Sequence, residues 1–268
     1  MMDKLKNDQR PIGIFDSGLG GLTVLKHLIK YFPNEKFIYL GDLANLPYGN
    51  KSRQNIIKYS LECANFLKSK NVKCIIIACN TASSYAYLEL KKSIDIPVYD
   101  VISPCIDKII LLKNKRVAIL GTEKTIEAKV YHNQIKSKNK SLKIYDIACP
   151  LFVPVVEEGL EGTNISMSII DMYLNSIKKA NVDCIVLGCT HYPILLNDLK
   201  KYFNNSVDIF HSGPIVAENL SRHINSNNNI NNIEYYVTDS PERFTKYGNK
   251  FLNQKINTPI NSDLLFEN

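Results

Sequence analysis

The sequence has no long hydrophobic run. Its most apolar stretch extends only from Cys74 to Cys79, which is far too short to cross a bilayer as a helix. The segment from Met1 to Arg10 is polar and lacks the apolar region of a secretory signal. We therefore expect a cytoplasmic protein without a membrane-spanning segment.

Paired cysteine motifs are also missing. The seven cysteines include no Cys-x-x-Cys pair. An odd number of cysteines, on a chain large enough to need no disulfides, is typical of reduced thiols rather than of a disulfide framework. Cys189 and His191, two positions apart, give only a weak zinc signal without a second pair of ligands. The sequence predicts no metal site.

Cofactor motifs are equally scarce. The chain contains no Gly-x-x-x-x-Gly-Lys phosphate loop, and no lysine stands out as the Schiff-base residue that pyridoxal phosphate needs. Gly18-x-Gly20, with Asp42 after the next expected strand, matches part of a dinucleotide fingerprint. Thr23, however, occupies the place of the third glycine. We expect no cofactor.

The composition fits an ordinary globular protein. The 268 residues are 45% hydrophobic and 22% charged, which excludes a disordered chain, a collagen and a coiled-coil rod. The net charge of +7 raises the possibility of nucleic-acid binding. The lysines are scattered rather than gathered in a stripe, which favours a solvated basic surface with a weak attraction for anionic substrates.

Short β-branched runs alternate with helical patterns along the chain. The expected strands are 12–15, 37–40, 72–78, 97–101, 117–120, 142–147, 183–187, 207–210 and 234–238. Most are nearly continuous in Ile, Val and Leu, as is typical of parallel strands buried on both faces. Helices fit between them, for example Ser52–Ser69, Thr163–Ala180 and Pro241–Leu252, the last with Ser240 as its N-cap. This order predicts an α/β fold with helices covering mainly parallel sheets.

Two connecting segments have a distinct composition. Asn225–Asn232 contains six asparagines in eight residues and is expected to be a loop that tolerates change. Ala44–Arg53, which includes Pro47, Tyr48 and Gly49, is a longer polar connection. Long loops in compact domains are more often functional than short ones.

The chain repeats itself once. Three pairs of segments match in the same order, namely Ile75–Thr81 with Ile185–His191, Ile12–Ser17 with Val117–Thr122, and Phe37–Tyr39 with Lys143–Tyr145, at offsets of 110, 105 and 106 positions. Three collinear matches indicate an internal duplication. Ligands bind at the carboxyl ends of strands in open parallel sheets. If two such domains face each other, Cys79 and Cys189 lie at equivalent positions across one cleft.

Cys79 and Cys189 differ from the other cysteines because each ends an apolar strand and precedes polar residues where a helix is expected. The free N–H groups at a helix start lower the pKa of a thiol and bind anions. The residues that follow these cysteines can donate hydrogen bonds to a carboxylate, namely Asn80, Thr81, Thr190 and His191. The remaining cysteines are interpreted as small buried hydrophobes without polar neighbours, namely Cys63, Cys74, Cys105, Cys149 and Cys184.

Two thiols on opposite faces of one ligand suit the inversion of a carbon acid. One thiolate removes the proton and the opposite thiol returns one from the other side, provided that each reaches the carbon. The turn Asp16-Ser17-Gly18-Leu19-Gly20-Gly21 follows the first expected strand. Its glycines let the backbone approach a ligand, and Ser17 can donate to an anion.

At these residues the sequence resembles bacterial glutamate racemases of the cofactor-independent aspartate/glutamate racemase superfamily. The matching segments span about residues 11 to 252 and are 15–21, 47–49, 78–82, 149–154, 157–159, 188–193 and 239–244. The two cysteine motifs in this order carry most of the resemblance, whereas the glycine turn alone would not be specific.

The resemblance implies interconversion of L- and D-glutamate without cofactor or metal, which supplies D-glutamate for peptidoglycan. It implies that Cys79 and Cys189 are the acid/base residues and that Asp16 and His191 assist them. The glutamate-binding positions that it implies are Asp16, Ser17, Tyr48, Gly49, Asn80, Thr81, Thr190 and His191, with Thr122 and Glu157 also near the site.

The resemblance further implies two pseudo-symmetric α/β domains, with the active site in the cleft between them. The expected boundaries are 1–101 plus 212–268 for the first domain and 102–211 for the second. A homodimer is the assembly that the family suggests. Association with nucleic acid or with gyrase, reported for some members, is not expected.

Alternative functions remain open. His191, directly after Cys189-Thr190, favours glutamate, because aspartate racemases of the superfamily tend to carry glutamate there. A related thiol enzyme would act on aspartate or another carbon acid. A protein without enzymatic activity would bind a partner such as nucleic acid through its positive charge.

Overall fold

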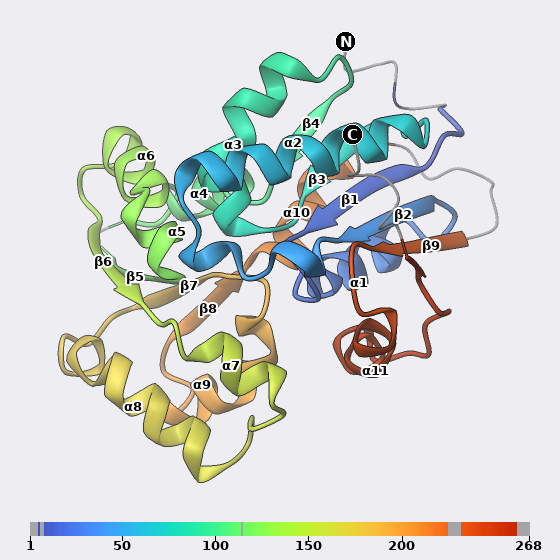
Figure 1. Cartoon of the computed structure of the whole chain (residues 1–268). Coiled ribbons are helices and arrows are strands. Elements are labelled where there is room, and N and C mark those ends of the chain that lie inside the picture. The colour runs from blue at the N-terminus through green and yellow to red at the C-terminus, as the bar shows by residue number, and fades with distance from the viewer. Residues whose placement is uncertain (1–4, 6–7, 114, 225–231, 262–268) are drawn as a thin grey trace.

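A computed structural model describes residues 5, 8–113, 115–224 and 232–261 of the chain (Figure 1). These residues form two β-sheets covered by helices. The first sheet has the strand order β10-β9-β2-β1-β3-β4 and the second the order β6-β5-β7-β8. The paired strands that the structure describes all run parallel, which confirms the expected α/β architecture.

All nine expected strands are present. The strands are β1 (Ile12–Asp16), β2 (Lys36–Gly41), β3 (Cys74–Ile77), β4 (Val98–Asp100), β5 (Arg116–Gly121), β6 (Lys143–Ala148), β7 (Cys184–Gly188), β8 (Asp208–His211), β9 (Asn232–Val237) and β10 (Ile260–Asn261). The central strands β1, β3 and β7 are buried along their whole length, as their continuous apolar sequences predict. The two-residue strand β10 was not expected, since it is exposed and too short to carry a pattern.

Eleven α-helices are present among the described residues. They are α1 (Leu22–Tyr31), α2 (Arg53–Ser69), α3 (Asn80–Ser93), α4 (Ser103–Ile109), α5 (Glu123–Glu127), α6 (Val130–Lys138), α7 (Phe152–Glu157), α8 (Asn164–Lys179), α9 (Leu196–Tyr202), α10 (Ser212–Leu220) and α11 (Pro241–Leu252). Ser52 and Thr163 cap α2 and α8 by accepting from the N–H groups of Asn55 and Ser166, so these helices begin where the sequence predicts.

The start of α11 differs in one respect from its prediction. Pro241 occupies the first turn as expected, but Ser240 has a left-handed backbone with φ of 48° and makes no capping hydrogen bond. The prediction of Ser240 as a capping side chain is therefore wrong. The expected loop Asn225–Asn232 lies outside the described residues except for Asn232, which is the first residue of β9.

The internal duplication is visible in the strand order and register. The order β2-β1-β3-β4 in the first sheet repeats as β6-β5-β7-β8 in the second. Ile12 pairs with Phe37 and Cys74, and Val117 pairs with Ile144 and Cys184. The offsets of 105 and 110 positions are thereby confirmed. The match of β2 with β6 is out by one residue, because Phe37 corresponds to Ile144 rather than to Lys143.

Helices cover both faces of the first sheet. Helices α2 and α3 pack on one face together with a separate hydrophobic cluster that includes Ile75 and Leu90 (Figure 1). On the other face, α1 packs against α10 and α11. The largest hydrophobic cluster draws side chains from both sheets, for example Ile14 and Leu187. This cluster is continuous across the two sheets. Within the described part of the chain, no helix has both the length and the apolar character needed to cross a bilayer.

Candidate active site

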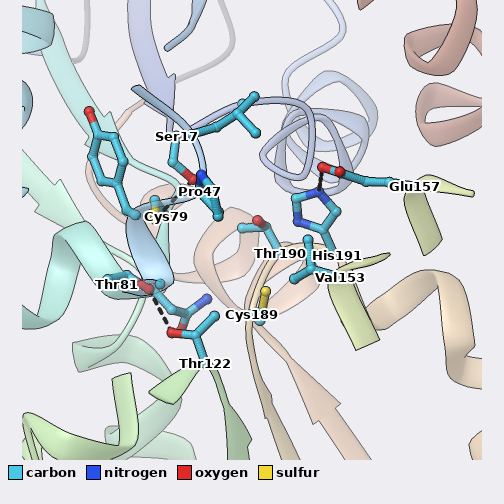
Figure 2. A pocket seen from close by; sticks show the side chains of 15 residues that line it. Ser17, Pro47, Cys79, Thr81, Thr122, Val153, Glu157, Cys189, Thr190 and His191 are labelled. Atoms are coloured by element: carbon cyan, nitrogen blue, oxygen red, sulfur yellow. Dashed lines mark hydrogen bonds and ion pairs between the residues drawn. The ribbon is translucent and has the colours of Figure 1, made fainter. Parts of the chain in front are cut away.

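A small cavity lies where the carboxyl ends of β1 and β3 face those of β5 and β7. Its volume is about 30 Å³, room for about two water molecules. The lining residues are Ser17, Gly18, Leu46, Pro47, Tyr48, Gly49, Cys79, Asn80, Thr81, Thr122, Val153, Glu157, Cys189, Thr190 and His191 (Figure 2). The site thus forms at the strand ends where parallel sheets bind ligands.

The cavity brings together every candidate site residue except Asp16. Asp16 is fully buried and does not line the cavity, but it accepts hydrogen bonds from Gly18 and Thr190, which do. Leu46, Pro47 and Val153 also line the cavity but were not expected there. Pro47 and Val153 belong to segments that carry the family resemblance, whereas Leu46 is an apolar residue with no pattern that separates it from ordinary packing residues.

Cys79 is held at the start of α3. Its sulfur accepts a hydrogen bond from Ala82 N at 3.4 Å and donates one to Ser17 Oγ at 3.6 Å. Burial raises the pKa of the Cys79 thiol to about 11, and the charge of Asp16 acts in the same direction, while hydrogen bonds from Ala82 and Ser17 oppose both. The expected lowering of this pKa by the helix start is therefore wrong for this conformation, because desolvation exceeds it.

Cys189 lies at the end of β7 and faces the same cavity (Figure 2). The chain after it forms a short 3₁₀ helix, Tyr192–Leu195, rather than the expected α-helix start. Burial raises the pKa of the Cys189 thiol, and the charges of Cys79 and Asp16 raise it further. The backbone N–H groups of His191 and Tyr192 act in the opposite direction. Both thiols are therefore protonated at neutral pH in this conformation.

Asp16 connects the glycine turn of the first sheet to the second sheet. Its carboxylate accepts hydrogen bonds from Gly18 N at 3.1 Å and from Thr190 Oγ1 at 3.3 Å. Burial raises the pKa of Asp16, although the charge of His191 and the hydrogen bonds from Gly21, Gly18 and Thr190 lower it. Asp16 thus positions the glycine turn relative to the segment that follows Cys189.

His191 is held by an acidic residue from the second sheet's own helices. Its Nε2 lies 3.2 Å from Glu157 Oε1, as the dashed line in Figure 2 marks, and the second oxygen of Glu157 accepts from Arg243 Nη2 at 3.1 Å. Burial raises the pKa of Glu157, but the hydrogen bond and charge of His191, with the charge of Arg243, lower it overall. The ionised Glu157 fixes the orientation of the imidazole.

The hydroxyl groups of Thr81 and Thr122 and the amide of Asn80 line another part of the cavity. Thr81 Oγ1 lies 2.9 Å from Thr122 Oγ1 and 3.1 Å from Thr125 Oγ1, so these hydroxyls join the first sheet to the second. Asn80 Oδ1 accepts a hydrogen bond from Tyr131 Oη at 2.8 Å. Among the described residues Asn80 Nδ2 has no hydrogen-bond partner, which leaves a buried donor beside the cavity.

The polar connection Ala44–Arg53 is held by Asp42. The hydroxyl of Tyr48 donates to Asp42 Oδ2 at 2.6 Å, and Thr238 donates to Asp42 Oδ1 at 2.8 Å. Two 3₁₀ turns, Leu43–Asn45 and Tyr48–Asn50, shape the loop. Asp42 directly follows β2, but both of its carboxylate oxygens accept from residues of this chain, so it supports the cavity wall.

Two of the buried cysteines do have polar neighbours, contrary to expectation. Cys63 Sγ lies 3.9 Å from Tyr48 Oη, and Cys149 Sγ lies 3.8 Å from the carbonyl oxygen of Ile147. All seven cysteines are free and buried, as predicted for reduced thiols.

Two glycines permit the close approach of the two sheets around the cavity. A β-carbon on Gly20 would overlap the side chains of Thr190 and His191, and one on Gly49 would lie 2.9 Å from Thr122 Cβ. Gly20 is therefore required by packing across the cleft, in addition to the backbone freedom expected of the turn.

This arrangement suits the removal and return of a proton. Two thiols from equivalent strands face one space, and donors for carboxylates surround them. Within the described ranges, no group of three or more His, Cys, Asp or Glu side chains is placed to hold a metal ion.

Comparisons with known proteins agree with this chemistry. The family model of Asp/Glu/hydantoin racemases matches residues 12–220. A glutamate racemase from Sulfurihydrogenibium sp. (strain YO3AOP1) is 42% identical over 89% of this chain and 92% of its own length.

Solved structures give the same result. The structure of glutamate racemase from Francisella tularensis in complex with D-glutamate is 36% identical, covers 94% of this chain and 97% of its own, and superposes with a TM-score of 0.86. A glutamate racemase isoform from Bacillus anthracis is 31% identical, covers 96% of this chain and 99% of its own, and has a TM-score of 0.90. The similarity extends over both sheets.

Proposed function

The chain belongs to the Asp/Glu/hydantoin racemases and, within that family, to the glutamate racemases, and we propose that it interconverts L- and D-glutamate. The observation that carries the proposal is the position of Cys79 and Cys189, which follow equivalent strands of the two sheets and line one cavity. Inversion at a carbon atom needs one acid/base group on each face, and a duplicated fold provides such a pair.

In the proposed reaction, the thiolate of one cysteine takes the proton from Cα of glutamate, which breaks the C–H bond and leaves a carbanion. The thiol of the other cysteine then gives its proton to the opposite face, which forms a new C–H bond and leaves that sulfur as the thiolate. Asp16 and His191 assist as polar neighbours of the two thiols. The reverse direction uses the same groups in exchanged roles.

The substrate supplies part of the activation. Burial holds both thiols in the protonated form, so a thiolate needs a positive charge nearby. The ammonium group of bound glutamate brings that charge into the cavity, and the pKa of the facing thiol falls when the substrate is present. This favours the reactive thiolate in the enzyme–substrate complex.

Carboxylate recognition is assigned to the donors that line the cavity. We propose that Ser17, Asn80, Thr81, Thr122 and Thr190 donate hydrogen bonds to the two carboxylates. Tyr48 and Gly49 shape the wall on the first sheet's side, while Glu157 acts by orienting His191. A cavity of about 30 Å³ is too small for an amino acid, so the two sheets must separate to admit it and close again around it.

The proposed activity also suggests a metabolic role, an assembly and a division into domains. We propose that the D-glutamate formed enters peptidoglycan synthesis in the cytoplasm, and that the protein is a homodimer, the commonest closed assembly. We also propose domain boundaries at 1–101 plus 212–268 and at 102–211. This division is supported by sheet membership, since β9 and β10 return to the first sheet after β8.

A substrate panel tests the proposal against its alternatives. Racemisation of glutamate, with little turnover of aspartate or other amino acids, supports it. Turnover of aspartate alone would assign the site to a related carbon acid. Silence toward every amino acid, together with DNA binding that weakens steeply with salt, would instead indicate a binding protein.

A further inference from the structure

Tyr131 reaches the cavity wall from the opposite sheet without lining the cavity itself. It lies on α6, packs with Val117 and Ile119 of the second sheet, and is 2% exposed. Its hydroxyl donates to the side chain of Asn80, the first residue of α3 on the first sheet. The bond therefore connects a residue that was not expected in the site with one that lines the cavity.

The partners of Tyr131 determine how the Asn80 amide is oriented. An amide has an acceptor end and a donor end, and the acceptor Oδ1 is already occupied by Tyr131 at 2.8 Å. The hydroxyl proton of Tyr131 is therefore directed at Asn80. The donor end, Nδ2, is thereby left over.

That remaining donor requires a partner. Asn80 is 2% exposed, and its Nδ2 is among the buried polar atoms that have no partner within the described part of the chain. A buried donor without a partner is unfavourable. An anionic oxygen in the cavity would satisfy it with a charge-assisted hydrogen bond.

We propose that Tyr131 is a positioning residue that fixes the Asn80 amide with Nδ2 directed at a carboxylate oxygen of the substrate. This inference rests on the proposed function, since it assumes that glutamate occupies the cavity. Because the hydroxyl comes from the second sheet, Asn80 is aligned only when the two sheets are together as they are here. Closure of the cleft thus completes the carboxylate site.

Tyr131→Phe tests the inference because it removes the hydroxyl and keeps the ring. The expected result is a rise of roughly tenfold in KM for both enantiomers of glutamate with less than about threefold change in kcat, as for the loss of binding shared by ground and transition states. Tyr202→Phe is the matched control. This change removes the hydroxyl of a buried tyrosine on α9, which donates to Asp171 Oδ1 at 2.7 Å. Tyr202 does not line the cavity.

A double-mutant cycle separates positioning from a general structural effect. In an Asn80→Ala background, Tyr131→Phe should cause no further rise in KM, since no amide remains to be oriented. A Tyr131→Phe enzyme with the KM of Tyr202→Phe would overturn the inference. An equal loss in the Asn80→Ala background would overturn it too. If the unmodified protein does not racemise glutamate, the proposed function itself fails, and this result is distinct from both.

Discussion

Gly20 and Thr190 touch across the cleft although they are separated by most of the chain. A β-carbon on residue 20 would overlap the Thr190 hydroxyl and would lie 2.5 Å from His191 Nδ1. Thr23, one turn further on, donates to the carbonyl oxygen of Thr190 at 2.8 Å. The glycine turn of the first sheet and the cysteine segment of the second therefore form a single packed contact beside the catalytic space.

Gly20→Ala should separate these two segments. Because the overlapping atoms belong to residues fixed by Asp16 and Glu157, the methyl group displaces Thr190 and His191, and kcat/KM should fall by at least about 100-fold. Gly18→Ala is the matched control in the same turn, since its β-carbon would have Leu46 at an ordinary 3.5 Å. Steady-state kinetics measure both. Equal activities of the two variants would contradict the packing argument.

Cys79→Ser and Cys189→Ser should each abolish racemisation. A serine hydroxyl is a much weaker acid than a thiol, and the loss of one acid/base group costs about 10²- to 10⁴-fold. Each variant should still exchange the Cα proton of one enantiomer with solvent, because the remaining thiol faces only one side. Nuclear magnetic resonance in D₂O follows exchange of each enantiomer separately. Full racemisation by either variant is incompatible with the two-thiol mechanism.

The alkylation rate of Cys79 should depend on pH as its burial dictates. The pKa of this thiol is raised from 9.0 to about 11, so the reactive thiolate increases with pH throughout the range below that value. In the absence of glutamate, the rate of reaction with iodoacetamide should still rise at pH 10, as measured by mass spectrometry. A plateau near pH 8.5 would show an ordinary exposed thiol. Glutamate should protect both cysteines.

Substitutions of Glu157 and of its partner Arg243 should lower kcat/KM to different degrees. Glu157→Gln replaces the carboxylate that holds His191, and kcat/KM should fall roughly tenfold or more, as expected for the loss of a hydrogen bond to a charged group. Arg243→Gln should cost less than about fivefold, because the Arg243 side chain is 43% exposed and exposed ion pairs are weak. A larger effect at Arg243 than at Glu157 would contradict this order.

A buried ion pair far from the cavity should affect the stability of the protein but not its activity. Lys73 Nζ lies 2.7 Å from Glu35 Oε2, with both side chains fully buried. Lys73→Met removes the ammonium group that contacts the buried Glu35 carboxylate and should lower the free energy of unfolding by about 3–5 kcal/mol. Lys68→Met, which breaks an exposed pair with Asp95, should cost at most about 1 kcal/mol. Urea unfolding measures both, and KM for glutamate should be unchanged in each variant.

Much of the fold could be predicted because it depends on local patterns. Continuous apolar runs such as Cys74–Ile77 identified the strands, and the repeated cysteine segments indicated the duplication. The two-residue strand β10 gave no such signal. Ser240 was misjudged because a serine before proline usually caps a helix, whereas here the backbone at Ser240 is left-handed.

Site residues could be predicted where the residue type itself indicates the chemistry. Properties that depend on burial or on contacts between distant segments could not be predicted. The cysteines and their neighbours gather in one cavity as expected. Their pKa values are raised rather than lowered, because desolvation depends on packing that no local motif encodes. Tyr131 and Leu46 reach the site through tertiary contacts alone, so no spacing in the sequence could have identified them.

The most direct test uses metal-free, cofactor-free protein incubated with L-glutamate in D₂O. The Cα–H resonance and the circular dichroism signal are followed together. The two-thiol account predicts that both decay to zero, since inversion returns a solvent deuteron to Cα. A persistent Cα–H signal and an unchanged dichroism signal, with folded protein and reduced thiols, would contradict the account.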